Sequence, residues 1–175
     1  MQGEFDSELG KGIDSLTESH AQGLIFDLRG NGGGLLHKAV TVANLFLGKG
    51  VRVVSIKDLA TQKEVEVFHT EKDVRTELPL ITLIDSESAS ASEIVSGALQ
   101  DHQRGLLIGA RTFGKGSVQQ IRPFSLFEFP GVGIKQTAQT FHLPSGRSNQ
   151  ILGVVPDLTV YRVPNPTEED KFALR

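Results

Sequence analysis

Three short apolar runs, each ended by a polar or glycine-rich segment, constrain the fold of this chain most strongly. The runs GLIFDL (23–28), LPLITLID (78–85) and GLLIGA (105–110) have the length of buried strands. Helical periodicity follows the first run at 35–47 and the second from residue 90 onward. In the later helix the predicted core face consists of Ala91, Ile94, Val95, Ala98 and Leu99. This alternation of strands and helices predicts an α/β fold.

Different patterns flank this central part of the chain. Phe5, Leu9, Ile13 and Leu16 recur at helical spacing, which predicts an N-terminal amphipathic helix. Alternating residues at 51–58 and 63–70 predict a half-exposed hairpin. Beyond residue 116 the segments 117–124, 131–141 and 150–163 are rich in β-forming residues and broken by turn signals. We therefore expect one domain over 1–163 with a β-rich C-terminal part, and a polar tail over 164–175.

Composition excludes several classes of function. The 175 residues carry a formal net charge of −3 and no dense Lys/Arg stripe, so we do not expect nucleic acid as a partner. Cysteine is absent, and no H-E-x-x-H or similar His/carboxylate spacing occurs, so we expect neither a metal nor another cofactor. No run approaches the roughly 20 apolar residues of a membrane-spanning helix.

The segment GARTFGKGS (109–117) nearly matches a phosphate-binding loop. Gly109 through Lys115 fit the pattern, but Gly116 stands where a Ser or Thr should hold magnesium. A phosphate-binding loop must also open a helix, whereas the residues after Lys115 alternate as a strand does and soon meet Pro123. A nucleotide site is therefore not expected, and Lys115 is either a solvated lysine in a glycine turn or a residue with other chemistry.

Ser90 invites two interpretations. Ser90 and Glu93 form the S-x-x-E pattern of a capping box ahead of the predicted helix, and a plain N-cap explains it fully. The same position also suits a nucleophile, because free main-chain N–H groups at a helix start can hold an oxyanion. The glycine cluster DLRGNGGG (27–34) ends another strand, so both loops are expected at one edge of the sheet, where α/β proteins bind ligands.

Five segments together resemble the signature blocks of the carboxyl-terminal processing peptidases, or tail-specific proteases, of the S41 serine peptidase family. They are DLRGNGGG, SASASEIVSGALQD, RTFGKGSVQQ, LPSGRS and LGVVPD, in the family order between about residues 23 and 160. The resemblance implies that Ser90 is the nucleophile and Lys115 its general base, with the family spacing of 115 − 90 = 25 residues. It further implies that Gln119 supports the lysine and that main-chain N–H groups of Gly34 and Ala91 form the oxyanion hole.

A lysine base needs a special environment. A free amine with a pKa of about 10.4 is almost entirely protonated at pH 7, and only desolvation favours the neutral form. If the segment after Lys115 is extended, Lys115, Ser117 and Gln119 share one face, so the amide can orient the amine. The resemblance then implies cleavage of protein substrates near their C-termini through an acyl-enzyme.

The resemblance carries further expectations. It implies a ClpP/crotonase-like core with a mixed sheet, and a catalytic fragment that lacks an upstream PDZ domain. The expected partners are polypeptides with accessible C-terminal tails, together with a homo-oligomer or an adaptor protein. The expected location is the bacterial periplasm or cell envelope.

Several alternatives stay open on sequence grounds. A histidine triad has candidates in His20, His37, His69, His102 and His142, although none lies in a recognisable catalytic block. Asp101 matches an aspartate reported as important in some family members, but its place late in a helix suits a structural role equally well. A non-catalytic ligand-binding module of the same fold, or a catalytic fragment that is inactive without its missing domain, are the other functions to be weighed.

Overall fold

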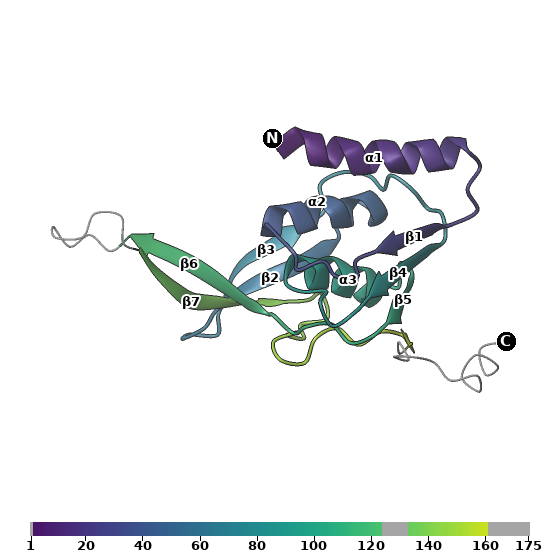
Figure 1. Cartoon of the computed structure of the whole chain (residues 1–175). Coiled ribbons are helices and arrows are strands. Elements are labelled where there is room, and N and C mark those ends of the chain that lie inside the picture. The colour runs from purple at the N-terminus through teal and green to yellow at the C-terminus, as the bar shows by residue number, and fades with distance from the viewer. Residues whose placement is uncertain (1, 124–132, 161–175) are drawn as a thin grey trace, which may run out of the picture.

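The architecture is an α/β fold with two sheets (Figure 1). The computed structural model describes residues 2–123 and 133–160. The elements are α1 (Gln2–Glu18), β1 (Leu24–Asp27), α2 (Leu36–Phe46), β2 (Arg52–Asp58), β3 (Glu64–His69), β4 (Leu80–Ile84), α3 (Ala91–Asp101), β5 (Leu106–Gly109), β6 (Ser117–Pro123), β7 (Gly133–His142) and β8 (Leu158–Thr159). The predicted fold class, with parallel and antiparallel strands, is confirmed.

The first sheet is parallel throughout and has the strand order β1-β4-β5-β8. Its two faces differ in burial. Leu24, Leu80 and Leu107 point into the core, whereas Ile25 and Leu106 on the opposite face are exposed. Because β1 and β4 are neighbours whose carboxyl ends meet at one edge, the loops that follow them lie together, as predicted.

The second sheet is antiparallel, with the order β3-β2-β7-β6. The predicted hairpin is present as β2 and β3, but only β3 is largely exposed. Strand β2 is buried from Val53 to Ile56, because helices α2 and α3 pack against it and β7 pairs with its second half on the side opposite β3. In Figure 1, β6 and β7 extend as a ribbon away from the helices.

Helices α2 and α3 form the middle of the core. They contact each other, both contact β2 of the antiparallel sheet, and α3 also contacts β5 of the parallel sheet. Figure 1 shows α1 lying across α2 on the outside. The apolar core joins all of these elements, so one core holds both sheets and the two loops at the strand ends.

The prediction of β-structure for the last segment, 150–163, is mostly wrong for the residues that the structure describes. Residues 150–157 form turns and irregular backbone, and only Leu158–Thr159 pair with β5. The Gly153 N–H bonds to the Asn149 carbonyl at 2.8 Å, which closes a turn where a strand was expected. Residues 161–163 and the predicted tail over 164–175 lie outside the described residues, as does the segment 124–132.

Candidate active site

Ser90 lies at the junction between the loop after β4 and helix α3. It occupies the N-cap position with φ 56° and ψ −113°. A positive φ disfavours a residue with a Cβ, and such strain concentrates at functional sites. Helix α3 begins at the next residue, so Ser90 has the predicted position at a strand-to-helix turn.

The glycine loop that follows β1 packs directly on this turn. Gly33 has φ +91°, and a Cβ at this position would lie 2.4 Å from the Ala89 carbonyl oxygen and 2.7 Å from the Ala91 nitrogen. Only glycine permits this approach. No described residue accepts a hydrogen bond from the main-chain N–H of Gly34 or of Ala91. Both predicted oxyanion donors are therefore unpaired in the described part of the chain.

Lys115 lies in the loop between β5 and β6 and is half-buried. Its main-chain N–H donates to Glu93 Oε2 at 2.9 Å, and the next N–H, that of Gly116, donates to Gln150 Oε1 at 2.9 Å. Strand β6 starts at Ser117, so no helix follows the lysine. This loop does not have the strand-to-helix context that phosphate binding requires.

Glu93 connects the serine turn to the lysine loop. Its side chain is completely buried, and its two oxygens accept four hydrogen bonds. Oε2 accepts from the main-chain N–H groups of Ser90 (2.8 Å) and Lys115 (2.9 Å). Oε1 accepts from Thr112 Oγ1 (2.6 Å) and from the Gly114 N–H (2.8 Å). One carboxylate thus fixes the backbone of both predicted catalytic residues.

The five predicted site residues line one cavity of about 300 Å³. Its polar part contains Ser90, Lys115, Ser117 and Gln119, and the remaining walls are formed by Gly34, Leu35, Leu36, Ala91, Ile94, Val118 and Phe141. Lys115, Ser117 and Gln119 thus line the same pocket, although a β-bulge separates Val118 from Gln119. Among the residues that the structure describes, no hydrogen bond joins the Ser90 hydroxyl to the Lys115 amine.

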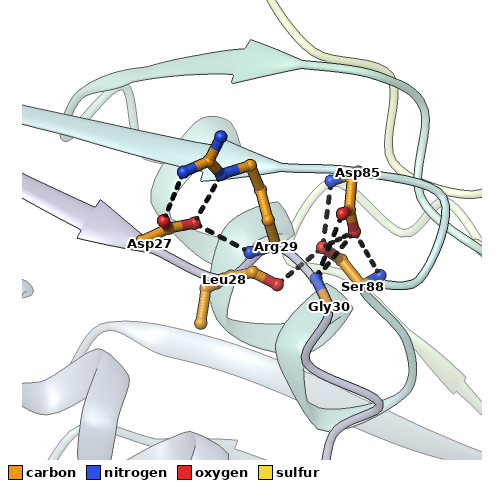
Figure 2. A network of polar contacts seen from close by, with 6 residues as sticks. All are labelled: Asp27, Leu28, Arg29, Gly30, Asp85 and Ser88. Atoms are coloured by element: carbon orange, nitrogen blue, oxygen red, sulfur yellow. Dashed lines mark hydrogen bonds and ion pairs between the residues drawn. The ribbon is translucent and has the colours of Figure 1, made fainter. Parts of the chain in front are cut away.

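Asp85 holds the glycine loop against the serine turn (Figure 2). Burial raises the pKa of this carboxyl, but hydrogen bonds from Gly30, Glu87 and Ser88 outweigh burial and lower its pKa below the ordinary 3.8. The carboxylate form is therefore the one that the surrounding N–H groups favour.

The histidines and Asp101, which were the alternative candidates for catalysis, lie outside this pocket. None of the five histidines lines the pocket that contains Ser90. His102 Nε2 lies 2.7 Å from the Arg52 carbonyl oxygen, and His142 Nδ1 lies 3.1 Å from that of Gly146. Asp101, at the far end of α3, accepts from the Ser145 N–H at 2.9 Å and pairs with Arg147 at 2.9 Å. These contacts give Asp101 a structural role.

Sequence reasoning missed three residues that shape the site. Thr112 and Gln150 carry side chains that bond to the buried carboxylate and to the lysine loop, and Asp85 bonds to the glycine loop. One signal was available, because Asp85 is a polar residue directly at the end of a buried strand, next to the serine segment. Gln150 had none, since its contact spans 34 residues of sequence.

The fold and the pocket define an α/β protein in which a helix-capping serine and a lysine share one cavity with two unpaired main-chain donors. The family model for peptidase family S41 matches residues 1–160, and the chain belongs to this family. It is 44% identical over 140 residues to the carboxy-terminal-processing protease of Bartonella bacilliformis. It is 38% identical over 164 residues to the tail-specific protease of Haemophilus influenzae.

These matches cover most of this chain but a minor part of the relatives. The Bartonella alignment covers 79% of this chain and 31% of the relative, and the Haemophilus alignment covers 89% and 23%. Among solved structures, the photosystem II D1 C-terminal processing protease superposes with a TM-score of 0.79 at 32% identity. That match covers 90% of this chain and 39% of the other. The resemblance predicted from the sequence blocks is confirmed at the level of the family and the fold.

Proposed function

We propose that this chain is the catalytic core of a serine endopeptidase that cleaves protein substrates near their C-termini. The observation that carries the proposal is the single cavity shared by Ser90, Lys115, Gln119, Gly34 and Ala91. Family membership and the names of the relatives, which are carboxyl-terminal-processing and tail-specific proteases, support this class of reaction.

In the proposed mechanism, Ser90 Oγ attacks the carbonyl carbon of the scissile peptide bond while the Lys115 amine takes the hydroxyl proton. The negative charge on the carbonyl oxygen is stabilised by the N–H groups of Gly34 and Ala91, each contributing on the order of 3 kcal/mol. The proton passes to the leaving amine, and the same lysine then activates a water that hydrolyses the acyl-enzyme.

Among the described residues no hydrogen bond joins the Ser90 hydroxyl to the Lys115 amine, although both residues line one cavity. In the proposed mechanism this hydrogen bond forms when substrate binds. Catalytic hydrogen bonds commonly tighten only in the substrate complex. Gln119 is exposed and lines the same pocket as Lys115, where its amide can orient the approaching amine.

The walls of the cavity indicate which side chains a substrate presents at the cut. Leu36, Ile94, Val118 and Phe141 are apolar residues that line the pocket. We therefore propose that peptides with a small or apolar residue at the cleaved bond are preferred over those with a charged one, because burying an unpaired charge there is costly.

Partners and location follow from the family as proposals. Polypeptides with accessible C-terminal tails are the proposed substrates, with self-association or an adaptor protein as the proposed assembly, and the periplasm or cell envelope as the proposed location. In the described parts of the chain no helix has the length and apolar character needed to cross a bilayer. Fractionating cells that express the natural gene product tests the location.

Turnover of a peptide ending in a free carboxylate tests the mechanism. Ser90→Ala, Lys115→Ala and Lys115→Arg should each abolish cleavage while thermal unfolding stays cooperative. Lys63→Ala, which removes an exposed lysine in the turn between β2 and β3, is the matched control and should cleave normally. Cleavage retained by either Lys115 variant would refute the proposed base.

A further inference from the structure

Asp85 binds two loops that come from different strands. It directly follows β4, and its Oδ1 accepts hydrogen bonds from the N–H groups of Gly30, Glu87 and Ser88, each at 3.0 Å. Oδ2 lies 3.1 Å from the same Gly30 nitrogen. Figure 2 shows Gly30, from the glycine loop after β1, and Ser88, from the turn that leads to α3, beside Asp85. Glu87 belongs to the same turn as Ser88.

The Ser88 side chain also connects the two loops. Its hydroxyl donates to the Leu28 carbonyl oxygen at 2.7 Å and accepts from the Asp85 N–H at 3.0 Å. It is completely buried, so these bonds are not exchanged with water. Further along, the Asn31 carbonyl oxygen accepts from the Ala89 N–H at 3.0 Å and from Ser92 Oγ at 3.0 Å. The two loops are thus joined at several successive points, and Asp85 contributes the charged acceptor.

The bonds from Gly30 to Asp85 belong to a continuous set of contacts that positions the glycine loop. Asn31 Oδ1 accepts from the Gly33 N–H at 2.9 Å, and Gly33 packs against the backbone at Ala89 and Ala91. Gly34, whose N–H is unpaired among the described residues, is the next residue along the chain. We expect a shift at Gly30 to be passed along the loop to Gly34, which lines the cavity of Ser90.

We propose that Asp85 is a positioning residue that fixes the glycine loop, and with it the Gly34 N–H, relative to Ser90. The inference rests on the proposed function, because it assigns a role in forming the oxyanion hole. Asp85 touches neither substrate nor reacting atoms and acts through Gly30 and Ser88. The nearby charges are those of Asp27, Arg29 and Glu87, and the Asp27–Arg29 pair is satisfied within its own loop.

Three variants separate this role from a general structural one. Asp85→Ala removes every acceptor, and Asp85→Asn keeps one oxygen at the Oδ1 position. Asp73→Ala is the control, because it removes an exposed carboxylate from the segment between β3 and β4. We expect Asp85→Ala to lower kcat about 100-fold with KM changed less than about threefold, since a misplaced oxyanion donor affects the transition state. The kcat of Asp85→Asn should be at least about tenfold higher than that of Asp85→Ala, and the kcat of Asp73→Ala should match that of the unaltered chain.

Amide hydrogen exchange provides a readout that does not depend on activity. In Asp85→Ala, and more weakly in Asp85→Asn, the hydrogen-bonded N–H groups of Gly30, Asn31 and Gly33 should exchange faster, while those of β2 should not. Unchanged exchange in both variants, or a KM effect without a kcat effect, would overturn the proposal. If the unaltered chain cleaves no peptide but exchange rises as expected, the positioning of the loop stands and the peptidase assignment fails.

Discussion

At the scale of residues, one buried carboxylate, that of Glu93, organises the site. Glu93 was predicted only as the fourth residue of a capping box, and the Ser90 N–H does bond to it. Its other partners, Thr112, Gly114 and Lys115, are 19 to 22 residues away in sequence. A capping residue of the helix therefore also determines where the lysine loop lies.

Replacing Glu93 by Gln should be strongly destabilising. In either orientation the amide places an NH₂ group where an oxygen now accepts two hydrogen bonds, and buried donors are left unpaired. Each unpaired group costs about 1–3 kcal/mol, so we expect a loss of at least about 2 kcal/mol in the free energy of unfolding. Urea denaturation measures it. Glu66→Gln on the exposed strand β3 is the control, and an equal effect in both variants would contradict this account.

At the scale of elements, the parallel sheet has one face in the core and one face outward. Neighbouring residues of β5 allow a direct test, because Leu107 is 0% exposed and Leu106 is 57% exposed. Leu107→Ala should cost about 2–5 kcal/mol through lost burial and a cavity, whereas Leu106→Ala should change stability by less than about 0.5 kcal/mol. Chemical denaturation of the two variants gives both numbers. Similar losses would mean that the outer face is also packed.

The regular elements were largely predictable from local patterns. Period and length identified α2, α3, β4 and β5 within a residue or two, because each has a clear apolar face or run. The failures have long-range causes. Strand β2 is buried because α3, which follows it by more than 30 residues, packs against it together with α2, and because β7, over 80 residues later, pairs beside it. The segment 150–157 is apolar yet irregular, because its backbone bonds to the lysine loop through Thr112 and Gly114.

The site was predictable in its residues but not in its supports. Ser90, Lys115, Gln119, Gly34 and Ala91 came from sequence blocks, and the fold brings all five to one cavity. The contacts of Asp85, Glu93 and Gln150 depend on how distant loops meet, which no periodicity encodes.

For the molecule as a whole, the lowered pKa values of several carboxyl groups predict how the free energy of unfolding depends on pH. Hydrogen bonds from Arg75 and Arg29 lower the pKa values of Asp14 and Asp27, and those from Thr61 lower the pKa of Asp58. A pKa lowered by folding means that the unfolded chain binds more protons in acid. Stability should therefore be fully present above about pH 4 and fall as the pH drops below it.

Urea denaturation between about pH 2.5 and about pH 7, a range that spans the ordinary carboxyl pKa of about 4, measures this dependence. The exposed Asp14–Arg75 and Asp27–Arg29 pairs are screened by salt, so part of the acid loss should disappear at high ionic strength. Stability that stays constant through this range, or rises in acid, would contradict the assigned directions.

The central claim is that Ser90 and Lys115 act together on a carbonyl. The most direct measurement is the rate at which a serine-directed fluorophosphonate probe modifies Ser90, followed by intact mass spectrometry on the unaltered chain, Ser90→Ala and Lys115→Ala. We predict one adduct on Ser90, none in Ser90→Ala, and a rate at least about 100-fold lower in Lys115→Ala, the usual contribution of a general base. Equal labelling rates with and without the lysine would contradict the claim.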